Sequence, residues 1–137
     1  MNFLLDTNAI SELMKPRPNP GLMAWIDGTD EDRIFLSVVS LAELRYGVER
    51  MSAGKSRRRL ELWLLELPLR FERRILPVDS VVADAWGRTV SRNEAAGRPI
   101  EAMDALLAAT AEMHNMTLVT RNVSGFSLLK AVLNPWT

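Results

Sequence analysis

The chain has 137 residues, and its 17 basic and 17 acidic side chains give a formal net charge of zero. Hydrophobic residues make up 47% and charged residues 25% of it, a balance that is typical of a globular domain and excludes a disordered one. The absence of cysteine excludes disulfides, thiolate metal sites and cysteine nucleophiles. No apolar run approaches the roughly 20 residues that span a bilayer. We therefore expect one domain over residues 1–137, in the cytoplasm and without a membrane partner.

Short apolar runs alternate with longer helical patterns along the chain. Strands are expected at residues 2–5, 33–37, 74–79 and 117–120, with a last edge strand or extended tail at 131–136. Helices are expected at residues 7–15, 20–28, 40–54, 56–71, 80–97 and 103–115, with a helical turn at 124–130. The alternation predicts an α/β fold with a mainly parallel sheet of four to five strands, flanked by helices.

Acidic side chains follow several of these elements. Asp6 comes directly after the first strand, Glu43 lies in the first turn of the helix after the second strand, and Asp104 begins an apolar helix. Asn122 follows the strand at 117–120. Because ligands bind outside the carboxyl ends of parallel strands, we expect these side chains to converge at one edge of the sheet.

Each acid also has a purely structural explanation. Asp6 fits the N-cap position of the helix behind it. Glu43 completes an S-x-x-E capping box with Ser40 as the cap. Asp104 is favourable at the positive end of a helix dipole. Capping does not exclude metal binding, so both explanations stay open at this point.

Converging carboxylates define a particular chemistry. Like charges repel unless a cation lies between them, and oxygen ligands favour Mg²⁺ or Mn²⁺. Such an ion activates water and stabilises the charge that develops on a phosphodiester. His114 is the only histidine, which excludes a two-histidine acid–base ribonuclease, and its position favours capping of a helix C-terminus. The pattern predicts a metal-dependent nuclease or phosphoesterase.

Basic charge is concentrated in one part of the chain. Residues 45–74 contain nine basic and four acidic side chains, so this segment carries +5 and the remainder −5. Fourteen of the 17 basic residues are arginine, whose planar fork suits phosphate. Either the segment binds phosphates or it is a solvated helix surface with i,i+4 ion pairs.

Four motifs in order resemble those of PIN-domain ribonucleases, above all the VapC-type and FitB-like toxins of bacterial toxin–antitoxin pairs. They are LLDTNAISEL, SVVSLAELRYG, DALLAATA and the pattern LVTRN…F…NPW, and together they span residues 4–136. The resemblance implies a PIN-like fold and endonucleolytic cleavage of RNA with Mg²⁺, for which Mn²⁺ can substitute. It also implies a homodimer and inhibition by a cognate VapB-like antitoxin.

The resemblance also assigns roles to individual residues. The catalytic positions carried over from the family are Asp6, Glu43, Asp104 and Asn122. The flanking polar positions are Thr7, Asn8 and Thr120, which are expected to hydrogen-bond the carboxylates and orient them. The expected contacts with RNA or antitoxin are Arg45, Arg57, Arg58, Arg59 and Arg121. Arg45 has the alternative of pairing with a neighbouring acid.

The fourth acidic position departs from the family pattern. Asn122 stands where many relatives have an aspartate, and Gly125 stands where others have an acid. We therefore expect no fourth carboxylate, with Asn122 or Ser124 acting through an oxygen or a bound water. This departure leaves open whether the site holds one metal ion or two.

The helix around residues 56–69 has two further roles open to it. Trp63, Leu64 and Leu67, beside the arginines, offer a groove for an antitoxin segment. The bulky apolar side chains of this helix also offer a dimer surface, unless they belong to the core.

The expected mechanism is hydrolysis by a metal-activated water. Asp6 and Asp104 would bind the metal directly and Glu43 through water, and in-line attack would leave 5′-phosphate and 3′-hydroxyl ends. Two alternatives stay open: a PIN-like protein that has lost catalysis and acts through protein contacts, and a nuclease directed at DNA.

Overall fold

Five short strands form the central sheet of the protein, which a computed structural model describes over residues 1–137. The strands are β1 (Phe3–Leu5), β2 (Ile34–Ser37), β3 (Ile75–Leu76), β4 (Thr117–Val119) and β5 (Val132–Leu133). Their order is β3-β2-β1-β4-β5, and all four pairings are parallel. The predicted α/β fold with a parallel sheet of four to five strands is confirmed.

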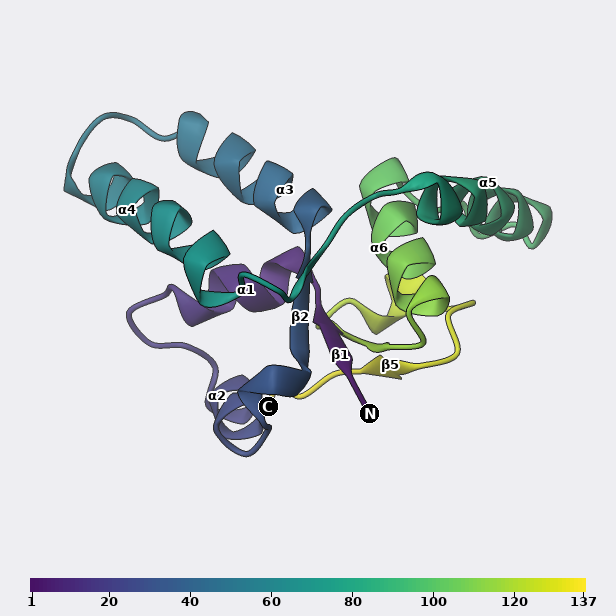
Figure 1. Ribbon diagram of the computed structural model, residues 1–137, viewed down its shortest axis with the longest axis horizontal. Helices are drawn as coiled ribbons and strands as arrows, with labels where there is room; N and C mark the ends of the chain where they lie inside the picture. Colours follow the sequence, from purple (N-terminus) through teal and green to yellow (C-terminus); the bar gives the residue numbers. More distant parts are fainter.

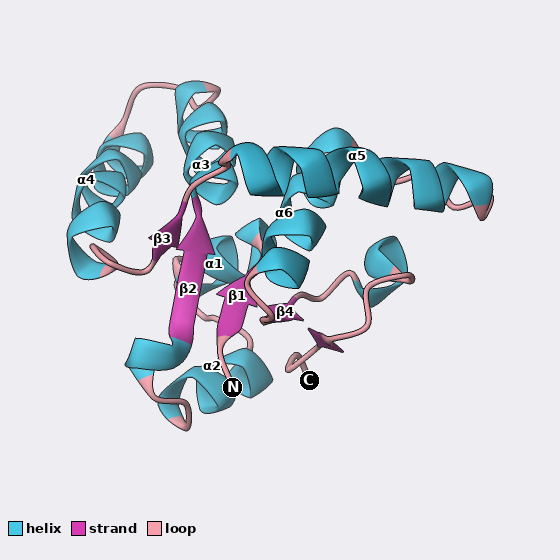
Figure 2. Cartoon of the chain, turned by 45° about the vertical axis from the view of Figure 1, so that its right-hand side comes forward, coloured by secondary structure: helices cyan, strands magenta, loops and turns pink.

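Six α-helices surround the sheet (Figures 1 and 2). They are α1 (Thr7–Leu13), α2 (Pro20–Asp27), α3 (Val38–Glu49), α4 (Lys55–Arg70), α5 (Ser80–Ala95) and α6 (Ala102–Met113). Two short 3₁₀ helices, η1 (Glu31–Arg33) and η2 (Val123–Phe126), precede β2 and follow β4. None of the helices is long and apolar enough to cross a membrane.

Alternating strand residues divide the core into two layers. Leu5 and Leu36 point to one face, where they pack with α1, α3 and α4. Leu4 and Leu118 point to the other face, where they pack with α6. Figure 1 shows this division, with α1, α3 and α4 on one side of the strands and α5 and α6 on the other. Since side chains alternate along a strand, even three-residue strands serve both layers.

The helix after β2 begins earlier than its sequence predicts. The N-cap is Ser37, the last residue of β2, whose side chain accepts a hydrogen bond from the Val39 N–H at 3.0 Å. The prediction of Ser40 as the cap is therefore wrong, because the strand runs straight into the helix and Ser40 lies one turn inside it, fully buried. The helix ends at Glu49 rather than near Gly54, and the predicted strand at 74–79 shrinks to Ile75–Leu76.

Other helix boundaries follow their sequence signals. Asp6 is the N-cap of α1, as its structural explanation predicts. Gly97 follows α5 with a φ of 69°, the left-handed conformation that glycine adopts without strain. His114 is the C-cap of α6, which confirms the capping position predicted for it.

Candidate active site

Asp6 lies at the carboxyl end of the central strand and is only 5% exposed. Its Oδ1 accepts a hydrogen bond from the Thr7 N–H at 2.6 Å, and its Oδ2 accepts one from Thr120 Oγ1 at 2.6 Å. Thr120 follows β4, the neighbour of β1, so the parallel pairing brings the two residues together across the sheet edge. Both carboxylate oxygens are thus held in place from two strands.

Glu43 is held by hydroxyl groups on α1 and α3. Thr7 Oγ1 donates a hydrogen bond to Glu43 Oε1 at 2.7 Å and lies 2.9 Å from Ser40 Oγ. Because the Thr7 proton is used toward the carboxylate, Ser40 must donate to Thr7. The order of donation is therefore Ser40 to Thr7 to Glu43, and it fixes the rotamer of each member.

Asp104 faces these two acids from the first turn of α6. Burial, and after it the charges of Asp6, Glu101 and Glu43, together raise its pKa to about 6. Burial also raises the pKa of Asp6, against the lowering effect of its bonds to Thr120 and Thr7. The three predicted acids therefore lie near enough to repel one another, as the sequence predicts.

The donor set suits a hard divalent cation. Asp6, Glu43 and Asp104 offer only carboxylate oxygens, and a cation between them would relieve the repulsion that raises the pKa of Asp104. The side chains do not meet in the structure as a ready-made cluster of three metal-ligating groups. The chemistry of the donor set therefore fits Mg²⁺.

Asn122 is exposed at the N-terminus of η2, two residues beyond Thr120. Its backbone N–H donates to Thr120 Oγ1 at 3.0 Å, and its Oδ1 accepts a hydrogen bond from Ser124 Oγ at 3.4 Å. The side chain of Asn122 covers Gly125, where a Cβ would lie 2.4 Å from Asn122 Nδ2. A larger residue at position 125 therefore requires a different Asn122 conformation.

The remaining polar residue of the first motif does not join this network. Asn8 is exposed, and no side-chain hydrogen bond links it to Asp6 or Glu43. In contrast, Thr7 and Thr120 each hydrogen-bond one of the acids, as expected. Ser40 was interpreted from the sequence only as a helix cap, but it is part of this network. Its position three residues before Glu43 on the same helix could have indicated that the two side chains lie close together.

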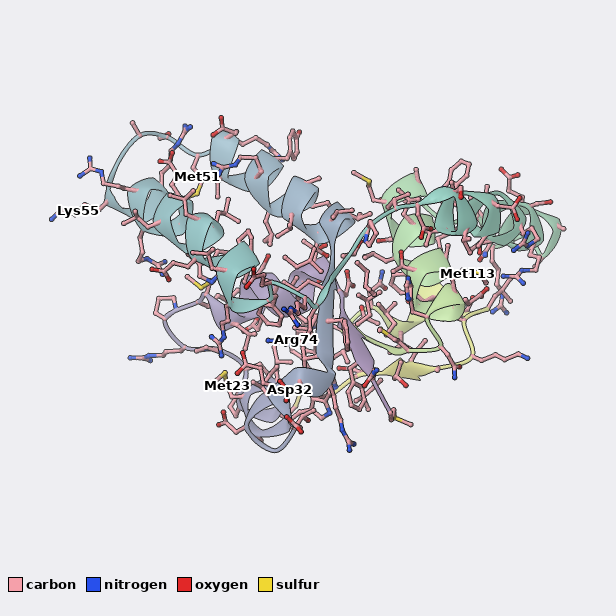
Figure 3. The ribbon with its side chains drawn as sticks, in the orientation of Figure 1. Met23, Asp32, Met51, Lys55, Arg74 and Met113 are labelled. Carbon is pink, nitrogen blue, oxygen red and sulfur yellow. The ribbon has the colours of Figure 1, made fainter.

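The arginines of residues 45–74 divide into structural and exposed groups. Arg57 donates to the Met51 carbonyl and pairs with Glu49 and Glu61, so it ties the loop before α4 to α3. Arg74 lies where α4 returns to the sheet (Figure 3) and donates to the Ile34 carbonyl at 2.7 Å. Part of the basic charge in this segment therefore stabilises the fold.

The other predicted contact residues lie on the surface. Arg45 and Arg58 are exposed and form no salt bridge, so the alternative of Arg45 pairing with an acid is wrong. Arg59 lines a pocket beside Glu43, and Arg121 lies directly before Asn122.

A pocket of about 350 Å³ between α1, α3 and α4 opens beside Glu43 and Thr7. Its walls include Met14, Leu60 and Trp63, with Lys15 and Arg59 also lining it. Leu64 and Leu67, expected beside Trp63 in a groove, are instead buried in the core, because they face the sheet from the inner side of α4.

The outer side of α4 carries exposed leucines. Leu62, Leu65 and Leu69 are 59%, 64% and 76% exposed. The helix predicted to be either core or a dimer surface thus supplies apolar residues to both the interior and the exterior.

A parallel α/β sheet with carboxylates at its carboxyl edge is the architecture of a class of acidic-site nucleases. The family model described as PIN domain matches residues 3–129, and the chain therefore belongs to the PIN domain family. The resemblance stated from the motifs is confirmed.

Two similar curated proteins are a toxin and a ribonuclease. The chain is 41% identical to Toxin FitB of Neisseria gonorrhoeae over 98% of both chains. It is 36% identical to VapC ribonuclease Y4jK of Sinorhizobium fredii over 98% of this chain and 97% of that protein. Relatives of this chain are thus named as toxins and as ribonucleases.

Solved structures of similar chains are complexes. FitAcB from Neisseria gonorrhoeae matches with a TM-score of 0.90 and 40% identity over 98% of each chain. VapBC2 from Rickettsia felis, bound to a DNA fragment from their promoter, matches with a TM-score of 0.80 and 26% identity over the whole of both chains.

Proposed function

We propose that this protein is the endoribonuclease toxin of a toxin–antitoxin pair, and that residues 1–137 act as one cytoplasmic domain. The observation that carries the proposal is the convergence of Asp6, Glu43 and Asp104 at the carboxyl edge of a PIN-domain sheet, where burial and then the charges of the other acids raise the pKa of Asp104 to about 6. Three mutually repelling carboxylates are a cost to the fold, and metal-dependent chemistry explains their presence.

The roles proposed for the acids follow from their surroundings. Asp6 and Asp104 would hold a Mg²⁺ ion, for which Mn²⁺ can substitute, and Glu43 would contact it through water. The ion, when bound, supplies charge neutralisation for the phosphodiester and lowers the pKa of water. Thr120 holds Asp6 toward the site, and Thr7 holds Glu43, so the protein keeps both carboxylates oriented without the ion.

The proposed reaction is hydrolysis of an RNA phosphodiester. A bond forms between the water oxygen and phosphorus, and the bond from phosphorus to the 3′ oxygen breaks. The products are a 5′-phosphate and a 3′-hydroxyl, and the 2′-hydroxyl takes no part as nucleophile. Glu43 would accept the proton of the attacking water, the departing 3′ oxygen would take a proton from solvent, and Asn122 would hydrogen-bond the phosphate or a water.

The pocket between α1, α3 and α4 is the proposed docking site for an antitoxin segment. Met14, Leu60 and Trp63 offer apolar surface, and Glu43 at its edge offers a negative charge to a basic side chain. An apolar and basic segment would therefore cover the pocket and block the acids together. The exposed leucines of α4 are the proposed surface for a homodimer.

The test is cleavage of a mixed RNA pool by the purified protein. Cleavage should stop in EDTA and return with Mg²⁺ or Mn²⁺. Asp6→Asn and Asp104→Asn should each lower the rate by more than the roughly 10- to 100-fold typical of losing an outer-shell partner. Glu94→Gln, which changes an exposed acid near the end of α5, is the matched control and should keep full activity.

Three results would reject the proposal. Full metal-dependent cleavage by Asp104→Asn would show that the acids do not have the metal-binding role assigned to them. Equal or faster cleavage of an all-deoxy substrate of the same sequence would indicate a DNA-directed nuclease. Absence of cleavage by the wild-type protein under any metal condition would favour the PIN-like protein that acts only through protein contacts.

A further inference from the structure

A second cavity, separate from the pocket beside α4, lies between the loop after α1 and the C-terminal segment. Its volume is about 350 Å³, and its walls are mostly polar. Lys15, Arg17 and Arg121 contribute three basic side chains to it, and Trp136 contributes an aromatic ring. No motif identified in the sequence includes Lys15 or Arg17.

Hydrogen bonds between distant parts of the chain build this cavity. Asn19 Nδ2 donates to the Thr137 carbonyl at 3.0 Å, and the Thr137 N–H donates to Asn19 Oδ1 at 3.1 Å. A Cβ on Gly21 would lie 2.4 Å from the Pro135 carbonyl oxygen, so only glycine allows this close approach. The cavity is therefore a fixed feature of the fold and not a gap between loose loops.

The charge of the cavity is positive and only partly neutralised. Lys15 Nζ pairs with Glu12 at 2.9 Å, and the same carboxylate accepts a hydrogen bond from the Asn19 N–H at 3.0 Å. The bond from Lys15 lowers the pKa of Glu12 most, and the charge of Arg121 lowers it further. Arg17 and Arg121 form no salt bridge, so two guanidinium groups face one polar cavity without a partner.

The cavity adjoins the acids along the surface. Arg121 lies between Thr120, which holds Asp6, and Asn122. Lys15 lines both this cavity and the pocket that contains Glu43. A strand of nucleic acid lying in the cavity would thus contact Arg121 and Lys15, which connect the cavity to the residues around the acids.

We propose that this cavity is a binding subsite for single-stranded RNA, in which Arg17 and Arg121 contact backbone phosphates and Trp136 stacks against a base. Unpaired guanidinium groups beside an aromatic ring are the combination that binds single strands without sequence preference. The subsite also offsets the repulsion between RNA and the three acids. The inference rests on the proposed function, because it assigns the cavity to the substrate of that same site.

A polynucleotide fits the cavity better than an antitoxin segment does. The walls contain little apolar surface, and the free charge is cationic, whereas the pocket beside α4 is largely apolar and ends at an acid. The two features therefore suit partners of opposite charge.

The test is equilibrium binding of a fluorescein-labelled 12-nucleotide RNA in EDTA, which prevents cleavage, over a series of salt concentrations. The double variant Arg17→Gln, Arg121→Gln should bind at least about 10-fold more weakly at low salt. The slope of log affinity against log salt should fall by about 1.4, since each phosphate contact to a single strand contributes about 0.7. The control is Arg33→Gln, Arg98→Gln, which removes two other exposed arginines without salt bridges and should keep the wild-type slope.

The ring is tested separately from the charges. Trp136→Leu should weaken binding roughly 5- to 150-fold without changing the salt slope, whereas Trp136→Phe should retain most of the affinity. Thermal unfolding of both variants checks that the C-terminal segment still folds, because Trp136 also packs against the core.

The outcomes separate this subsite from the proposed function. If wild-type protein cleaves RNA but the arginine double variant keeps the wild-type affinity and slope, the subsite is wrong and the function stands. If the double variant binds RNA normally but loses affinity for an antitoxin peptide, the cavity is a protein interface and the proposal is overturned. If wild-type protein neither binds nor cleaves RNA, both proposals fail.

Discussion

Replacing Asp104 with asparagine should stabilise the metal-free protein while it abolishes activity. The pKa of Asp104 is raised from 3.8 to about 6 in the folded chain, so the folded state binds this proton more tightly than the unfolded chain does. The free energy of unfolding therefore falls as the pH rises from about 4 to above 6, and the loss is complete at pH 7. Asparagine keeps the shape of the side chain but carries no charge at either pH.

The size of the effect is modest. A rise in pKa from 3.8 to about 6 corresponds to about 3 kcal/mol at about 1.4 kcal/mol per pH unit. Because Asp104 is only half-buried, solvent screening reduces the contribution to about 1 kcal/mol. In a chain of this length, that gain corresponds to an increase in Tm of about 3 °C.

The assay is urea unfolding in EDTA, followed by tryptophan fluorescence at pH 7 and at pH 4.5. Asp104→Asn should be more stable than the wild type at pH 7, and the difference should shrink at pH 4.5, where the wild-type carboxyl is mostly protonated. Mg²⁺ should then stabilise the wild type and not the variant, since binding to the folded state alone shifts unfolding. A variant less stable than the wild type at pH 7 would refute the reasoning, as would a difference that is equal at both pH values.

Three other predictions concern hydroxyl groups and a backbone contact. Thr120→Val should lower the free energy of unfolding by about 1–3 kcal/mol, measured in urea, because a buried carboxylate oxygen loses its donor, and Thr120→Ser should restore most of it. Gly21→Ala should destabilise the fold by about 1–3 kcal/mol through its clash with the Pro135 carbonyl. The effect of Gly21→Ala is measured by thermal unfolding, with Gly47→Ala as the control. The added Cβ at position 47 meets nothing within 4 Å, so this variant should be neutral or stabilising. Ser40→Ala should raise the Mg²⁺ concentration needed for half-maximal cleavage by about 10-fold or more; an unchanged requirement would mean that this hydroxyl only fills space.

The order of strands and helices in the sequence was sufficient to place two of the three acids. Asp6 ends a strand, and Glu43 lies one turn into a helix that follows a strand, so their convergence required only that the sheet be parallel. The rule about strand ends does not cover Asp104, because α6 follows another helix. Its position opposite Asp6 depends on how α6 packs on the sheet, and the signals for it were its place at the start of an apolar helix and the family resemblance.

Other features depend on contacts between distant residues. Ser40 matches a capping motif locally, yet the strand before it ends in Ser37, which takes the cap and leaves Ser40 free to bond Thr7. Arg57 belongs to a basic run, but the loop after α3 brings Glu49 within 2.9 Å of it. Composition and periodicity could not predict these pairings, since each one requires two elements to be placed in space.

The sheet order has a consequence for the newly made protein. β1 is made before the other four strands of the sheet, but it lies in the centre of the sheet and pairs with β4, the fourth strand in chain order. The hydrogen bond between Asp6 and Thr120 joins residues 114 positions apart. At about 5–20 residues per second, roughly 6–23 s pass between the synthesis of its two ends. A nascent chain therefore has no assembled acidic site until β4 and Thr120 have been made and have reached β1.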